Sequence, residues 1–192
     1  HGQLVFRGDA GVHFQGDPQA FLSGGLVADV TIDGLTWVSD TPGLAAGVRA
    51  EYASDIVVSM VEMNNITGGL KGTSLGGDTV SGVMLSHVSD AVVAGCVFSD
   101  FEGGAVSTTM QTFWGDGHAY GPVPSGGIAA AILANLSPGL RAVGNTVQGL
   151  TGGVGTPQIN SGGSPGAGGV AAGVYLTSAP SAFLSGNVFT DI

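Results

Sequence analysis

Two carboxylates near the middle of the chain have the spacing of an acid–base pair. Asp100 and Glu102 flank Phe101, and residues two apart in a strand point to the same face. Nearby carboxylates can divide the acid and base roles of glycoside chemistry when their surroundings move their pKa values apart. Asp116 and His118 follow in the next segment and would complete a catalytic set. The alternative is that these acids are solvated turn residues.

Aromatic residues accompany this set in the segment TFWGDGHAYG, which covers residues 112–121. Phe113, Trp114 and Tyr120 offer flat faces and hydrogen-bonding groups, a combination that suits a sugar ring. Lys71, from an earlier loop, would add a cation to the same substrate-binding site. The alternative is that the aromatic residues form the small core of a long loop. No ligand spacing indicates a metal site, and we expect no cofactor.

An internal repeat supplies the elements that must position these residues. Four segments align without gaps, beginning at Gly47, Gly82, Ala131 and Gly173, and a partial copy begins at Val27. Apolar residues alternate within each copy, and turn-forming residues separate the alternating runs, which indicates short strands. One apolar column contains Ile32, Val58, Val93, Ala142 and Leu184. Three strands and three turns per copy predict an all-β parallel β-helix of about five to six coils. A β-sandwich or meander is the alternative.

The distance between successive copies varies, and the extra residues enter after a Gly-Gly pair. Along the apolar column the successive distances are 26, 35, 49 and 42 residues. Insertions at one corner of a stack project from one face, which is often the binding face. The loops cover residues 70–81, 105–130 and 154–172. We expect an irregular cap over residues 1–26 and a parallel β-helix over residues 27–192, which continues beyond residue 192 in a longer protein.

Composition excludes several classes of partner. The 192 residues contain 4 Lys plus Arg and 14 Asp plus Glu, for a net charge of −10. Nucleic acids and anionic membranes both need a cationic surface, so neither is an expected partner. No run approaches the roughly 18 apolar residues of a membrane span, so we expect no membrane insertion. The single cysteine, Cys96, occupies a repeat column and is expected to be buried and inert.

Apolar residues also occupy positions that should face outward. One outward column contains Arg49, Met84, Leu133 and Tyr175, and another contains Val57, Val92, Arg141 and Phe183. A solvated face does not normally carry such stripes. We therefore expect them to be covered by the long loops or by another subunit of a homo-oligomer, such as a trimer.

With these columns in place, residues 27–192 resemble the pectate-lyase-like right-handed parallel β-helix superfamily. The resemblance is carried by DVTIDGLTW from Asp29, GLRAVGNTV from Gly139 and SAFLSGNVF from Ser181. It implies a right-handed β-helix with an asparagine ladder in its second turn. Asn145 and Asn187 match the ladder asparagine, but the earlier copies lack it, so the ladder has at most two rungs.

The superfamily includes polysaccharide lyases, hydrolases and epimerases, phage tailspikes and secreted adhesins, so the resemblance predicts fold better than function. The leading hypothesis is a structural or glycan- or receptor-binding module of an extracellular, secreted or virion surface assembly. Its partners would be a polysaccharide or cell-surface glycan, further copies of the chain, or flanking domains. The alternative is a glycan hydrolase, lyase or epimerase with its cleft at the corner that bears the loops. The sequence leaves open which of the two is correct.

Overall fold

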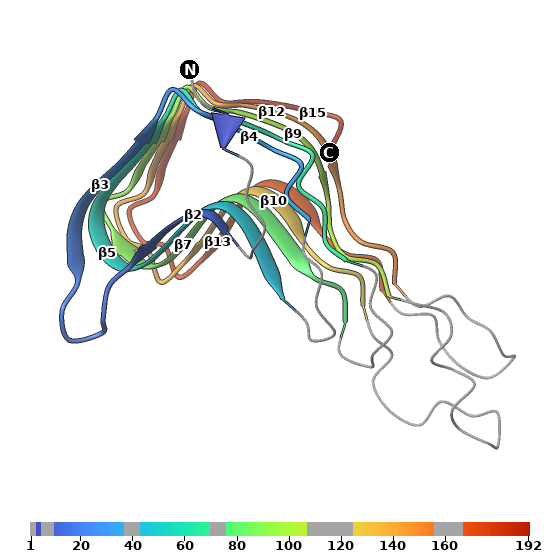
Figure 1. Ribbon diagram of the computed structural model, residues 1–192, viewed down its shortest axis with the longest axis horizontal. Coiled ribbons are helices and arrows are strands. Elements are labelled where there is room, and N and C mark those ends of the chain that lie inside the picture. Colours follow the sequence, from blue (N-terminus) through green and yellow to red (C-terminus); the bar gives the residue numbers. More distant parts are fainter. Residues whose placement is uncertain (1–2, 5–9, 37–42, 70–75, 107–124, 156–166) are drawn as a thin grey trace, which may run out of the picture.

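The structure is a computed structural model, and it describes residues 3–4, 10–36, 43–69, 76–106, 125–155 and 167–192. These residues form fifteen strands and no helix. Every pairing between two of these strands is parallel. The predicted all-β class with parallel strands is therefore confirmed. Figure 1 shows two sheets that enclose a common interior.

The first sheet has six strands, and each neighbour across the sheet comes from the next repeat along the chain. In order they are β1 (Gln3–Leu4), β4 (Thr31–Asp33), β6 (Glu62–Asn64), β9 (Val97–Glu102), β12 (Thr146–Thr151) and β15 (Val188–Thr190). Parallel neighbours in register bring chemically similar residues of successive repeats side by side, which explains why the sequence columns recur.

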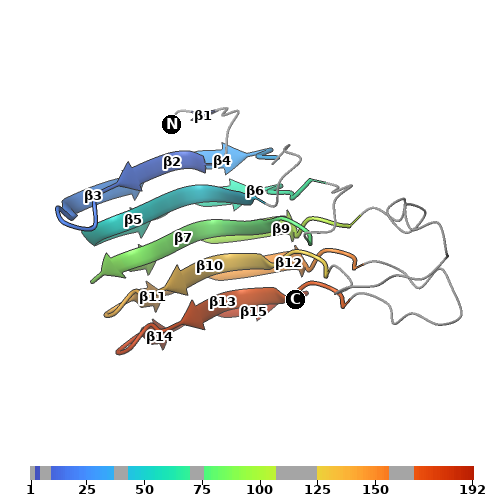
Figure 2. The same ribbon diagram turned by 90° about the horizontal axis from the view of Figure 1, so that it is seen from below.

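The second sheet has nine strands and consists of two rows that share the long strand β5. The arched row contains β2 (Ala10–Gln15), β5 (Leu44–Ser59), β7 (Thr79–Ser89), β10 (Ala129–Asn135) and β13 (Ala171–Thr177). The side row contains β3 (Leu22–Ala28), the end of β5, β8 (Val92–Ala94), β11 (Arg141–Val143) and β14 (Phe183–Ser185). Figure 1 shows the curvature of the arched row, and Figure 2 shows the repeats following one another across the molecule.

Apolar columns fill the interior between the sheets. One column contains Val27, Val58, Val93, Ala142 and Leu184. Another contains Ile32, Met63, Phe98, Val147 and Phe189. The members from the first four repeats are buried, because side chains that point inward from one repeat are covered by those of the next.

The first repeat does not align as the sequence predicts. Val27, rather than Ile32, pairs in the column of the side row, and Ile32 belongs to the six-stranded sheet. The prediction was wrong by one strand, because Gly34 resembles the turn glycine Gly95 of a later repeat. Asp29 occupies that turn position instead, with a φ of 54°. Parallel pairing also includes β1, β2 and β3, which begin before the first repeat found in the sequence.

Left-handed backbone recurs at the same bends in successive repeats. One bend has positive φ at Asp29, Met60, Gly95, Gly144 and Gly186, and a second at Gly34, Asn65, Asp100, Gly149 and Asp191. A third bend has it at Gly24, Asp55, Asp90, Gly139 and Ser181. Glycine adopts this conformation without steric cost, and Asn and Asp tolerate it better than other residues. Asp55 and Asp90 are thus among the turn-forming residues expected between the alternating runs.

Asn145 and Asn187 form a short ladder between two repeats. The Nδ2 atom of Asn145 donates to Oδ1 of Asn187 at 2.9 Å, and the backbone N–H of Asn145 donates to the same oxygen at 3.0 Å. Asn145 Oδ1 in turn accepts the backbone N–H of Cys96 at 2.9 Å. Buried amides need such partners, so the two-rung asparagine ladder that the resemblance implies is present.

Candidate functional site

The predicted catalytic acid Asp100 occupies one of the left-handed bends. Its φ is 59°, and the same bend carries Asn65, Gly149 and Asp191 in other repeats. The side chain is exposed on the outer face of the six-stranded sheet. An aspartate is favoured there by backbone conformation alone. Asp100 therefore has a structural reason to be present that is independent of catalysis.

Glu102 faces solvent from the end of β9. Its backbone accepts the N–H of Gly68 at 2.8 Å and donates to the carbonyl of Ile66 at 3.0 Å. The prediction that Asp100 and Glu102 both face outward is confirmed, since both are exposed while Phe101 is buried. The remaining predicted site residues lie outside the described residues: Lys71, Phe113, Trp114, Asp116, His118 and Tyr120.

Glycine-rich segments on either side of the three predicted loops pack closely against one another, and we call this contact the glycine neck. The Gly104 N–H donates to the Asp78 carbonyl at 2.8 Å, and the Gly127 N–H donates to the Gly104 carbonyl at 2.9 Å. The Gly153 N–H donates to the Gly127 carbonyl at 2.9 Å, and the Gly169 N–H donates to the Gly153 carbonyl at 2.7 Å. A Cβ atom on Gly127 would lie 1.8 Å from the Asp78 carbonyl oxygen. Outgoing and returning backbones thus pack directly together and fill this corner.

Asp78 is a buried carboxylate at this neck that the sequence analysis did not select. Its Oδ1 atom accepts the backbone N–H of Gly43 at 2.6 Å, and its Oδ2 atom accepts that of Gly69 at 3.1 Å. The residue is fully buried, and a buried charge needs such partners. Asp78 therefore joins two loop-bearing repeats. The sequence feature that could have indicated Asp78 is its position directly after Gly76 and Gly77.

A cluster of three titratable side chains lies on the outer face of the arched row. Arg49 Nη2 donates to Oε1 of Glu51 at 3.1 Å, and His13 Nε2 lies 3.3 Å from Oε2 of Glu51. The Arg49 and Glu51 side chains are only 21% and 17% exposed, against 36% for His13. Charge-assisted hydrogen bonds hold the group in one arrangement. We call these three residues the charged triad.

The charged triad continues into an apolar track across the arched row. Parallel pairing places Met84 beside Arg49, Leu133 beside Met84, and Tyr175 beside Leu133. Each of these side chains is half-buried, while their neighbours along the strands point inward. Strands lie about 4.8 Å apart, so the track from His13 to Tyr175 spans about 19 Å. A surface of this kind offers polar groups at one end and flat apolar contact along the rest.

The outward column is visible in the sequence, but the triad is not. Arg49 and Tyr175 were recognised in it, whereas His13 and Glu51 were not. In β2, His13 and Gln15 face outward. This alternation would have indicated the triad if β2 had been paired with β5 in the sequence alignment. That pairing depends on the first repeat, which the sequence alignment did not extend to residue 10.

The part of the chain that the structure describes contains no group of three or more His, Cys, Asp and Glu side chains arranged to hold a metal ion. Within the same residues, no helix has the length and apolar character needed to cross a membrane. In comparisons with known proteins, no family model, curated protein or solved structure matches this chain. The functional conclusion therefore depends on the geometry of the charged triad and its track.

Proposed function

We propose that this chain is a right-handed parallel β-helix module of about five to six coils that binds a glycan on the outer face of its arched row. It would belong to an extracellular, secreted or virion surface assembly of the tailspike, fibre or adhesin kind. The parallel register of all strand pairs, the repeated left-handed bends and the Asn145–Asn187 ladder support the β-helix.

The charged triad is the observation that carries the binding proposal. Folding half-buries Arg49 and Glu51 on an outer sheet face and sets the exposed His13 beside them. Fixed donors and acceptors beside apolar surface are the usual means of holding a sugar, whose hydroxyls need partners and whose C–H face needs contact. Met84, Leu133 and Tyr175 provide that contact.

The charges favour a neutral glycan over a polyuronate. Glu51 largely neutralises Arg49 within the triad, and the chain carries a net charge of −10. An acidic polysaccharide would approach against this field, and like charge lowers association rates. We therefore expect binding of neutral oligosaccharides with about four residues in contact, since the track is about 19 Å long.

Binding to a panel of immobilised neutral and acidic oligosaccharides tests this proposal. We expect at least one neutral glycan to bind, and Glu51→Gln to weaken it by about tenfold or more, because hydrogen bonds to charged groups contribute about 1.5–3 kcal/mol. Glu62→Gln is the matched control, since Glu62 is an exposed acid on the other sheet. No binding to any glycan, or equal loss in both variants, would contradict the proposal.

The same experiment separates binding from turnover. If the enzymatic alternative were correct, the bound glycan would be cleaved or epimerised, and Asp100 and Glu102 would be required. We expect the recovered glycan to be unchanged, because both acids are exposed and Asp100 occupies a recurring bend. New reducing ends, unsaturated sugars or epimers that disappear in Glu102→Gln would establish the enzyme instead.

A further inference from the structure

A fourth left-handed bend lies where the arched row gives way to the side row, and bulky residues occupy it. Tyr52, His87 and Leu136 have φ values of 49°, 57° and 49° there, and the parallel pairing puts them at equivalent positions of successive repeats. This backbone conformation is uncommon for non-glycine residues and an outlier for bulky ones. At the three bends described above, every residue with positive φ is Gly, Asp, Asn or Ser except Met60. The fourth bend therefore differs from the others in residue type rather than in backbone shape.

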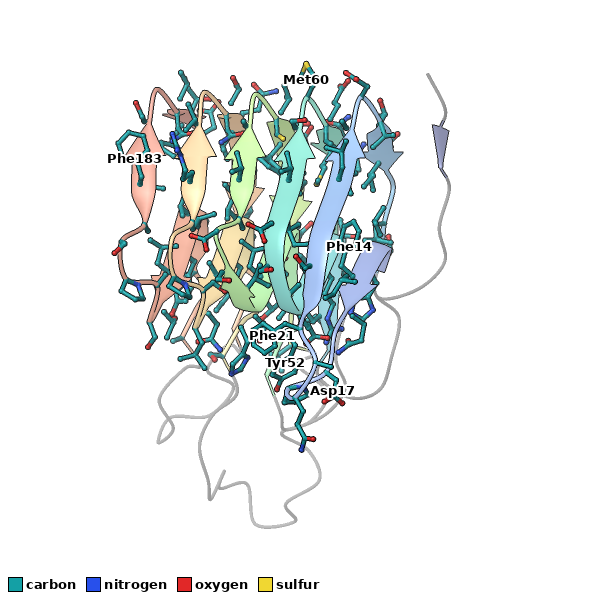
Figure 3. All side chains as sticks on the ribbon, turned by 90° about the vertical axis from the view of Figure 1, so that its left-hand side faces the viewer. Phe14, Asp17, Phe21, Tyr52, Met60 and Phe183 are labelled. Carbon is teal, nitrogen blue, oxygen red and sulfur yellow. The ribbon has the colours of Figure 1, made fainter. Side chains whose placement is uncertain are left out.

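Phe21 joins two of these residues in a stacked aromatic group. The Tyr52 and His87 rings are stacked with their centroids 4.8 Å apart, and the Phe21 ring packs edge-on against Tyr52 at 6.0 Å. The Ser86 hydroxyl lies 3.1 Å from Nδ1 of His87 and restrains the imidazole. We call Phe21, Tyr52 and His87 the aromatic ridge. Figure 3 shows Phe21 and Tyr52 together at one end of the side row and Met60 at the other end.

The packing of the interior does not account for these bulky side chains. Phe21 is 49% exposed and Leu136 is 44% exposed, while Tyr52 and His87 are half-buried and lie outside the core. A residue held in a sparsely populated backbone region reduces stability, and such residues cluster at binding and catalytic sites. The other bends show that Gly or Asp supports a left-handed bend in this fold. What the fourth bend presents to solvent is therefore the better reason for its bulky side chains.

A column of hydrogen-bonding side chains lies beside the aromatic ridge on the outer face of the arched row. It contains Gln15, Glu51, Ser86, Asn135 and Thr177. Each member lies two residues along its strand from its counterpart in the column that runs from His13 to Tyr175. Glu51 also belongs to the charged triad, so the ridge adjoins the site proposed above. Successive members are one strand spacing apart, about 4.8 Å, which is close to the length of one sugar unit in an extended chain.

We propose that the aromatic ridge is the second border of the glycan site and contributes to its specificity, an inference that rests on the proposed function. The oligosaccharide runs across the strands along the polar column, with the apolar track on one side and the ridge on the other. The Tyr52 and His87 rings cover each other's faces, so their edges make the contact. The Tyr52 hydroxyl and a His87 ring nitrogen can donate to or accept from sugar hydroxyls. Phe21 and Leu136 add apolar contact for the C–H groups.

Glycine at the strained position separates a binding role of the ridge from a structural one. Tyr52→Gly removes the ring and relieves the left-handed backbone. We expect its midpoint in urea to equal or exceed that of wild type, and its affinity for neutral oligosaccharides to fall by about tenfold, because a hydrogen bond and a ring contact are lost. The probes are cello-, malto- and manno-oligosaccharides of about four to six units, which span the track. Isothermal titration calorimetry measures their binding.

Two further variants complete the experiment. Tyr52→Phe keeps the stacked ring and should keep the urea midpoint, yet it should weaken binding by about threefold or more, because only the hydroxyl is lost. Met60→Gly is the matched control, since Met60 has a φ of 52° and is 62% exposed at a bend on the far side of the side row. This control should keep or raise the midpoint and leave binding unchanged.

The outcomes distinguish failure of the ridge from failure of the glycan site itself. A wild type that binds no neutral oligosaccharide contradicts both. Binding that falls in Glu51→Gln but is unchanged in Tyr52→Gly and Tyr52→Phe overturns the ridge alone and leaves the proposed function standing. Equal loss of binding in Met60→Gly would also overturn it. If Tyr52→Gly lowers the midpoint, the affinity of Tyr52→Phe decides, and an unchanged affinity assigns the ring a structural role.

Discussion

At the scale of single residues, Asn145 hydrogen-bonds to the repeats on both sides of it. Its side chain accepts from Cys96 and donates to the carbonyl of Val93 and to Asn187. The residue is buried, so water cannot replace these partners. An asparagine at this position is therefore required by hydrogen bonding rather than by turn conformation.

We predict that Asn145→Ala destabilises the fold by about 2–4 kcal/mol, because it leaves the Cys96 N–H and the Val93 carbonyl buried without their partner. Urea unfolding followed by circular dichroism measures the change. Asn187→Ala is the comparison, and it should cost less because Asn187 is only half-buried. Equal costs would show that the ladder position, rather than its burial, determines the effect.

Cys96 provides a second prediction, based on pH. Burial raises the pKa of its thiol above the ordinary value of 9.0, and backbone hydrogen bonds offset this only in part. Above pH 9 the unfolded state loses the proton while the folded state retains it, so stability falls as pH rises. The test is to measure the free energy of unfolding of wild type and of Cys96→Ala from pH 7 to 10.5. The difference between the two free energies of unfolding should be constant below about pH 8 and shrink above pH 9. A difference that stays constant throughout would show that the thiol is not protected.

At the scale of elements, the glycine neck accounts for much of the high glycine content. The 36 glycines include residues with left-handed backbone and others that have no room for a side chain. Gly127 belongs to the second kind, because its Cβ would meet the backbone of Asp78 and Gly104. Backbone atoms cannot move aside as a flexible side chain can.

We predict that Gly127→Ala destabilises the fold by about 1–3 kcal/mol or more through overpacking against backbone. Gly168→Ala is the matched control, since nothing lies within 4 Å of its Cβ position and its φ is not positive. That change should stay within about 0.5 kcal/mol or stabilise slightly, because alanine restricts the unfolded chain. Similar midpoints for the two variants in urea would contradict the close packing of the neck.

The repeat predicts the elements well because stacking requires the same residue type at the same position. The alternation around Val83 and Ile132 indicates strands, and both residues are buried in paired strands. The first repeat is the exception. There Asp29 occupies a bend where the later repeats mostly have glycine, so the alignment shifted by one strand and did not include β2 in the repeat. Turn residues that are chemically different but conformationally equivalent are the main reason for that error.

At the scale of the whole molecule, the site was less predictable than the fold. Of the residues selected for chemistry, Asp100 and Glu102 are among the described residues, and the others are not. The charged triad joins His13 of β2 to Arg49 and Glu51 of β5, which are distant in sequence. Only the parallel register of β2 with β5 brings them together, and no local motif records that register.

The whole molecule then presents outer faces with different properties. The arched row offers a charged triad and an apolar track, which we propose bind a glycan. The side row exposes apolar side chains such as Leu26 and Phe183, bordered by the exposed carboxylates of Asp55 and Asp90. The six-stranded sheet carries Asp100 and Glu102 on its exposed face.

Hydrogen–deuterium exchange with and without a bound neutral oligosaccharide tests the location of the glycan site most directly. We predict slower exchange in peptides from β2, β5, β7, β10 and β13, because the ligand covers the arched row and limits its opening. Peptides from β9 and β12 should be unchanged. Protection confined to β9, β12 or the loop segments would contradict the arched-row site and move the glycan to the glycine neck.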